Sequence, residues 1–151
     1  MKKAISAALA LTAALGLCSC GSPRSDLRVN IPEGTVCRIT EKDKSCRVRI
    51  SYVSEDTNTL TVTEPVELSG LSLRQAGDTF SLSLGGMICR GDQPALPESS
   101  VLMKAMAAIK KLNSLPPDTS ADLNADGGIT CEASGFSFRT DSSGKLTELN
   151  F

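Results

Sequence analysis

The chain has 151 residues, a formal net charge of −1 and 40% hydrophobic residues, which predicts a single globular domain. It contains no histidine, and this excludes Ser-His-Asp triads, Cys-His pairs and histidine-ligated metal sites. No basic stripe is visible, so we expect no nucleic-acid partner. Carboxylate-only and Ser-Lys catalysis have no motif here, so we predict a non-enzymatic protein without a cofactor.

The N-terminal residues show three successive features. Lys2 and Lys3 are followed by an uncharged run of about 14 residues and then by Leu17-Cys18-Ser19-Cys20. The run is too short for a membrane-spanning helix, which needs roughly 20 residues, and it suits the apolar region of a secretory signal. This order resembles the signal of bacterial lipoproteins, in which a lipobox ends in the acylated cysteine.

The resemblance implies that Cys20 is the lipidated residue, because Ser19 before it is small and Leu17 is aliphatic. Cys18 fits less well, since bulky Leu17 precedes it. Residues 1–19 are then the lipoprotein signal peptide, residues 20–33 the lipid anchor and tether, and residues 34–151 one extracytoplasmic domain. We therefore expect a lipid-anchored protein on the extracytoplasmic face of the cell membrane. An ordinary cleaved signal of a secreted protein and a retained helix are the alternatives.

Residues 35–90 favour a β-meander, because apolar and polar side chains alternate in successive segments. Strands are predicted over residues 36–41, 47–52, 60–63, 68–73, 79–84 and 87–89. Polar or glycine-rich turns separate them at residues 41–44, 75–78 and 85–86, and Gly70 predicts a bulge or bend.

One amphipathic helix follows the meander. Ser99 or Ser100 is a favoured N-cap, apolar residues then recur at steps of three and four to about Asn113, and Pro116-Pro117 stops the pattern. Strands return at residues 129–132, 136–140 and 146–151. This order predicts an α+β fold: a curved antiparallel β-sheet, a half-barrel-like meander, with the helix packed on one face.

Two segments carry a weaker resemblance. Thr59 to Leu71 and Thr140 to Leu146 are similar to patterns in small lipoproteins of Gram-positive bacteria. They resemble the carrier-type half-barrel lipoproteins with the LolA-like fold, over roughly residues 35–151. The resemblance implies a curved sheet that wraps around helices and takes up acyl chains on its concave side. It assigns no functional residue.

Four cysteines remain once Cys20 is assigned to the anchor: Cys37, Cys46, Cys89 and Cys131. An even number in an exported protein predicts two disulfides. If residues 41–44 close a hairpin, Cys37 and Cys46 face each other on paired strands, and Cys89 bonds Cys131 by default. The other two pairings, four free thiols and a four-cysteine metal site are alternatives, although no Cys-x-x-Cys spacing supports a metal.

The sharpest local motif is Asp122-Leu123-Asn124-Ala125-Asp126-Gly127. It looks like the start of an EF-hand or dockerin calcium loop, in which Asp122, Asn124 and Asp126 supply oxygen ligands and glycine makes the sharp turn. The twelfth position, which needs an acid, is Ala133. We therefore expect a polar turn before a strand, with calcium binding as the alternative.

Two further clusters have both a structural and a binding interpretation. Met103 and Met106 are expected in the core, or else they line a soft apolar pocket. The cluster Lys42, Lys44, Arg47 and Arg49 is expected to be a solvated mixed-charge face, or else it contacts anionic lipid headgroups.

The sequence thus predicts a non-enzymatic membrane lipoprotein that presents a binding surface or a small apolar groove to a lipid or envelope protein partner. One alternative is a LolA-like lipid or lipoprotein carrier module with a true half-barrel cavity. A second alternative is a calcium-stabilised scaffold or adhesion module.

Overall fold

The computed structural model describes residues 29–151 except residues 55, 113, 116–118 and 120. The predicted signal peptide, the acylated Cys20 and most of the tether therefore lie outside the described residues. Asn113, the expected end of the helix, lies outside them as well.

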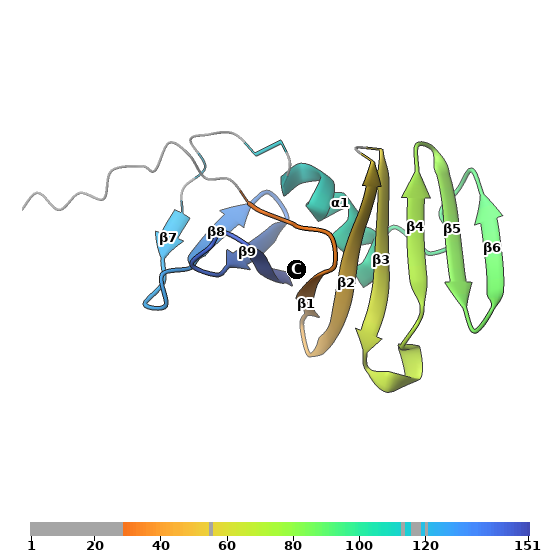
Figure 1. The fold of residues 1–151 in the computed structure, drawn as a ribbon, viewed down its shortest axis with the longest axis horizontal. Coiled ribbons are helices and arrows are strands. Elements are labelled where there is room, and N and C mark those ends of the chain that lie inside the picture. The colour runs from red at the N-terminus through yellow and green to blue at the C-terminus, as the bar shows by residue number, and fades with distance from the viewer. Residues whose placement is uncertain (1–28, 55, 113, 116–118, 120) are drawn as a thin grey trace, which may run out of the picture.

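The described part of the chain contains ten strands, one α-helix and one short 3₁₀ segment, joined by loops (Figure 1). The first six strands are β1 (Thr35–Glu41), β2 (Lys44–Ser54), β3 (Thr57–Glu64), β4 (Ser72–Ala76), β5 (Thr79–Leu84) and β6 (Met87–Gly91). The 3₁₀ segment η1 (Val66–Leu68) separates β3 from β4, and the helix α1 (Val101–Leu112) follows β6. The last four strands are β7 (Ala121–Leu123), β8 (Ile129–Ala133), β9 (Phe136–Thr140) and β10 (Leu146–Asn150).

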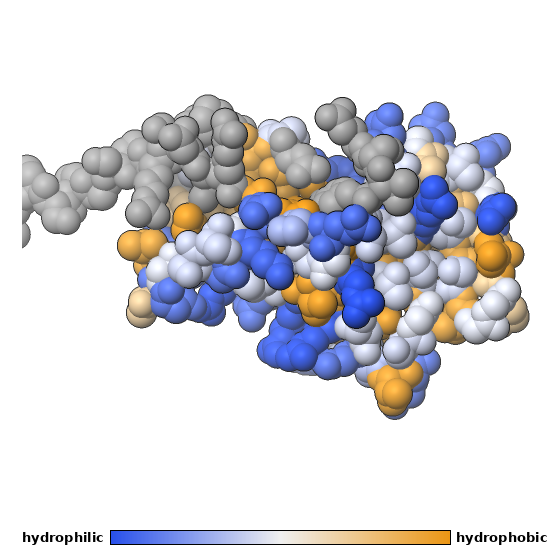
Figure 2. All heavy atoms as spheres, viewed as in Figure 1, coloured by the Kyte–Doolittle hydropathy of each residue, from blue (hydrophilic) through white to orange (hydrophobic). Residues whose placement is uncertain are grey.

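All ten strands form one open sheet in the order β6-β5-β4-β3-β2-β1-β10-β9-β8-β7. Helix α1 lies behind β1 to β3 in the view of Figure 1 and contacts β1 and β3. The opposite face of β2 to β5 is turned toward the viewer, and Figure 2 shows it to be mainly hydrophilic. The predicted α+β fold, a curved sheet with one helix packed on one face, is confirmed.

The predicted meander is confirmed, since β1 to β6 pair antiparallel with their neighbours along the chain. One segment differs. The strand expected over residues 68–73 begins only at Ser72, because the chain first forms η1 and then turns at Gly70, whose φ is +87°. Gly70 donates its N–H to the Val62 carbonyl at 2.9 Å, which closes this loop onto β3.

The C-terminal strands match the predicted segments, and β7 is an additional short strand that the sequence did not indicate. The expectation of a fully antiparallel sheet is wrong at one place: β10 pairs parallel with β1. A parallel pair needs a long connection, and here the whole chain between β1 and β10 supplies it. Strand periodicity predicts that a segment is a strand but does not choose its partner.

The helix begins where its sequence predicts. Ser100 is the N-cap, and its Oγ accepts a hydrogen bond from the Met103 N–H at 3.4 Å. Met106 is buried in the core and Met103 packs against it, so the methionines belong to the core as expected. The Lys104 ammonium pairs with the Glu41 carboxylate, which ties the helix to the β1–β2 hairpin. The hydrogen bond from Lys104 lowers the pKa of Glu41.

The core lies between the helix and one face of the sheet. Its largest fully buried apolar side chains are Phe138, Ile39, Ile50, Leu60, Leu73, Met106, Ile109, Leu146, Leu149, Val48 and Val62. They come from the helix and from six strands on both sides of the parallel β1–β10 pair, so both halves of the sheet share one core.

We expect Ile109→Ala to lower the free energy of unfolding by about 2–5 kcal/mol, because it leaves a cavity between the helix and the sheet. Lys110→Ala, on the exposed side of the same helical turn, should change it by no more than about 0.5 kcal/mol. Urea unfolding followed by circular dichroism measures both values. Equal effects of the two substitutions would show that the helix does not pack as described.

Candidate functional site

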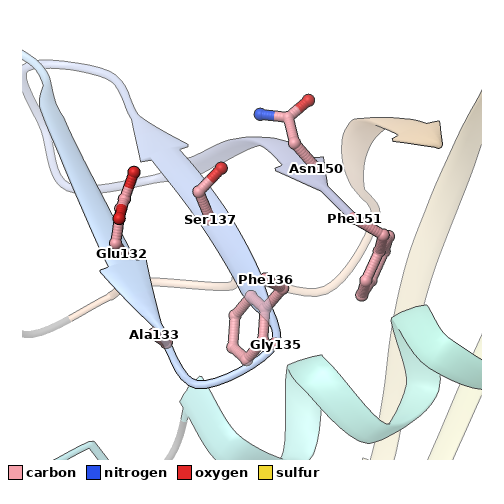
Figure 3. Close-up of a pocket in the computed structure, with 7 residues that line it drawn as sticks. All are labelled: Glu132, Ala133, Gly135, Phe136, Ser137, Asn150 and Phe151. Atoms are coloured by element: carbon pink, nitrogen blue, oxygen red, sulfur yellow. The ribbon is translucent and has the colours of Figure 1, made fainter. Parts of the chain in front are cut away.

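A pocket of about 370 Å³ opens at the turn between β8 and β9 (Figure 3). Its lining combines apolar and polar side chains: Glu132, Ala133, Gly135, Phe136, Ser137, Asn150 and Phe151. In Figure 3 the rings of Phe136 and Phe151 point toward the helix side of the sheet, whereas Glu132, Ser137 and Asn150 point to the opposite side. The lining therefore has an aromatic part on the helix side of the sheet, here called the aromatic wall, and a polar part on the opposite side.

The aromatic wall is held in place by ring contacts. The ring centroid of Phe136 lies 6.3 Å from that of Phe138 and 6.2 Å from that of Phe151, within the range of favourable tilted pairs. The lining supplies one side-chain carboxylate, from Glu132.

A pocket at these residues was not predicted from the sequence. Three of the chain's four phenylalanines fall in its last 16 residues, and this concentration was an available signal. The turn at Gly135 and the pairing of β10 with β9 bring them together, and neither is visible in a one-dimensional pattern.

The four domain cysteines do not form the expected disulfides. Cys37, Cys46 and Cys89 are free thiols, and Cys131 is buried on β8 without a disulfide to any of them. The β1–β2 hairpin is confirmed, but its two-residue turn at Lys42-Asp43 pairs Glu41 with Lys44. Direct opposition of Cys37 and Cys46 requires a turn one residue earlier.

In this register Cys37 lies opposite Val48, and Cys46 lies opposite Ile39. The two cysteines are thus diagonal neighbours on one face of the hairpin, where Cα atoms are about 7–8 Å apart, beyond the usual disulfide range. Burial raises the pKa of the Cys37 thiol to about 12, with a smaller contribution from the Glu148 carboxylate.

The pairing of Cys89 with Cys131 is wrong for a topological reason. Cys89 lies on β6 and Cys131 on β8, and seven strands of the sheet stand between them. The nearest strand that carries another cysteine is β2, which is four strand spacings from β6, or about 19 Å. A disulfide requires Cα atoms within about 7 Å, so none of the other three cysteines in the described part of the chain is within reach of Cys89.

In the reduced, folded protein we expect Cys89, which is exposed, to be alkylated by iodoacetamide much faster than Cys37, which is buried and has a raised pKa. Peptide mass spectrometry after a short labelling pulse measures the two rates. Cys89→Ser should abolish labelling of the residue 89 peptide and leave the labelling rate of Cys37 unchanged. Equal labelling rates, or a peptide that links Cys89 to Cys131, would contradict the described arrangement.

The proposed calcium segment forms the turn of the β7–β8 hairpin. Asp122 lies on β7 opposite Thr130, and the Asn124 Oδ1 accepts a hydrogen bond from the Thr130 hydroxyl at 3.0 Å. The Asp126 carboxylate accepts bonds from the Gly128 N–H at 3.1 Å and from the Arg139 guanidinium at 2.5 Å. These two donors hold the pKa of Asp126 below its usual range.

The segment therefore forms the expected polar turn, and the side-chain oxygen atoms of Asn124 and Asp126 already accept hydrogen bonds from the protein. The neighbouring strand also approaches closely, because a Cβ on Gly128 would lie 2.1 Å from the Thr140 carbonyl oxygen. Within the part of the chain that the structure describes, no group of three or more His, Cys, Asp or Glu side chains is placed to hold a metal ion.

We expect the melting temperature to be the same in millimolar calcium and in excess chelator, because Asp126 is committed to Arg139 and Gly128. Differential scanning calorimetry on the purified protein measures this. A rise in melting temperature with calcium, lost in Asp126→Asn, would instead establish an ion at this turn.

The predicted basic cluster is dispersed by the fold. Lys42 lies in the β1–β2 turn and Lys44 begins β2, while Arg47 pairs with Glu64 at 3.1 Å. Arg49 projects from the middle of the outer face of β2, and it forms no ion pair with another described residue. These four residues therefore do not form one basic patch, and they lie on an exposed surface of mixed charge, as expected.

No protein-family model, no curated protein and no solved structure matches the chain. Among the described residues, no helix has the length and apolar character needed to cross a membrane.

Proposed function

We propose that the chain is a membrane-anchored extracytoplasmic lipoprotein whose α+β domain acts by binding and performs no catalysis. The observation that carries the proposal is the N-terminal order of Lys2-Lys3, an uncharged apolar run and Leu17-Cys18-Ser19-Cys20. Acylation at Cys20 would hold the domain at the bilayer, since each buried methylene contributes about 0.8 kcal/mol.

Two features of the domain support a binding role. The pocket beside Phe136 and Phe151 offers an apolar wall of limited size. At the other end of the sheet, the helix-side face of β5 continues the core with half-buried Leu82 and Leu84, and Met87 on β6 is 73% exposed. These surfaces favour a small apolar groove as the binding element.

The carrier-type alternative requires a cavity for acyl chains on the helix side of the sheet. Over β1 to β3, the fully buried side chains Ile39, Ile50 and Leu60 pack in one core with the helix residues Met106 and Ile109. Only the partly covered strip on β5 and β6 supports a lipid-binding surface there. We therefore favour a modest groove over a deep half-barrel cavity.

Metabolic labelling with a radioactive fatty acid tests the anchor. When the full chain is produced in a bacterium that processes lipoproteins, we expect label in the protein, loss of label in Cys20→Ala and retention of label in Cys18→Ala. The matched cysteine two residues earlier is the control, because both substitutions change the same short segment.

Label that is lost in Cys18→Ala and kept in Cys20→Ala would move the anchor to Cys18. An unlabelled parent protein, recovered from the cytosol with its N-terminus intact, would refute the proposed function.

A further inference from the structure

The face of the sheet opposite the helix carries an ordered set of arginines. The register places Arg49 of β2 opposite Thr61 of β3. Two residues along β3, Thr59 lies opposite Arg74 of β4. Alternate residues of a strand share a face, so Arg49 and Arg74 project from the same side.

The row continues across the next strands. Arg74 lies opposite Ser81 of β5, and Ser81 lies opposite Arg90 of β6. Arg49, Arg74 and Arg90 are all exposed and occupy every second strand from β2 to β6. At about 4.8 Å per strand, this arginine row is roughly 19 Å long.

The arginine row has little opposing charge on its own strands. Glu64 is the single carboxylate in the five strands β2 to β6, and Arg47 already pairs with it. None of Arg49, Arg74 and Arg90 forms an ion pair with another described residue. The row is thus a local concentration of positive charge on a chain whose net charge is −1.

Hydroxyl groups flank the arginine row. Most outer-face positions between and beside the arginines carry hydroxyls, namely Ser51, Thr59, Thr61, Ser72, Ser81 and Ser83, and the remaining neighbours two residues along the strands are Arg47, Ala76 and the exposed Ile88. The Thr61 and Ser72 hydroxyls lie 3.1 Å apart and bond to each other. By register, no outer-face position of β2 to β6 holds an aromatic residue, so this face has no platform on which bases stack.

Acidic residues border the row at both ends of the strands. Asp56 and Asp78 are exposed at one end, where the Gly77 N–H bonds to the Asp56 carbonyl. Glu64 and Glu67 are exposed at the other end, around η1. A planar anionic membrane laid on this face would meet these carboxylates, whereas a narrow chain that crosses the strands along the row would avoid them.

We propose that the outer face of β2 to β6 binds a linear acidic polysaccharide, with its carboxylates on Arg49, Arg74 and Arg90 and its sugar hydroxyls on the Ser and Thr side chains. Charge complementarity favours this occupant, because guanidinium groups bind carboxylates in a bidentate geometry and hydroxyls both donate and accept hydrogen bonds. The inference rests on the proposed function in one respect, because export is what would bring the domain to such polymers.

Affinity electrophoresis tests the proposal with the full-length protein in a non-ionic detergent. Polygalacturonate in the gel is the probe, and neutral dextran is the uncharged control. We expect retardation by polygalacturonate alone, weakened by added salt. The triple variant Arg49→Ser, Arg74→Ser, Arg90→Ser should bind at least about tenfold more weakly.

The matched control is Lys42→Asn, Lys110→Ser, Lys111→Ser, which removes the same charge away from the face, at the hairpin turn and on the helix. It should bind like the parent. If circular dichroism shows that the arginine triple variant has lost its fold, the three single variants replace it, each expected to weaken binding by about two- to threefold.

The proposal would be overturned if both triple variants lost binding to polygalacturonate equally, or if polygalacturonate did not retard the parent protein. An oligonucleotide, or phosphatidylglycerol in the micelles, should compete less well than free polygalacturonate for the protein. If either competes equally well, the proposal is overturned in favour of that partner. Cys20→Ala should leave polysaccharide binding unchanged, so failure of the acylation proposal and failure of this one are separately visible.

Discussion

The burial of one face of a wide sheet under a short helix is the constraint on which the rest of this structure depends. Helix α1 has 12 residues, which corresponds to about 18 Å. Ten strands at the usual spacing extend over roughly 43 Å. One helix of this length cannot cover the whole face, so burial is complete near β1 to β3 and declines toward β6, where Met87 is 73% exposed. The apolar surfaces available for binding lie where the helix does not reach.

The two faces of the sheet have different chemistry because strand side chains alternate in direction. The helix-side face of β2 to β4 carries Val48, Ile50, Leu60, Val62 and Leu73 in the core. The other face carries mainly arginine, serine and threonine, which are stable in contact with water. Acidic residues are confined largely to the turns that border this face, which leaves the arginine row free of carboxylate partners on its own strands. The result is a charge separation that net charge does not reveal.

The cysteines show how strongly turn length controls chemistry in a sheet. A two-residue turn fixes the register of β1 and β2 and sets Cys37 and Cys46 diagonally, so their thiols pack in or against the core. Cys89 lies on an edge strand at one end of the sheet, far from the other three cysteines. The described thiols therefore differ in reactivity through burial, since Cys89 is exposed, Cys46 is half-buried, and Cys37 and Cys131 are buried.

The sequence by itself determined the local structure: the strands of the meander, the helix with its Ser100 cap and the turn at Asp122–Gly128, because alternation, helical spacing and turn residues act over a few neighbours. It also excluded histidine chemistry outright. The tertiary structure alone decided which strands pair. It made β10 a parallel neighbour of β1, separated Cys89 from Cys131, brought the rings of Phe138 and Phe151 against Phe136 and aligned Arg49, Arg74 and Arg90. These residues are distant in sequence, and only the register and order of the sheet, set by packing of the whole core, bring them together or hold them apart.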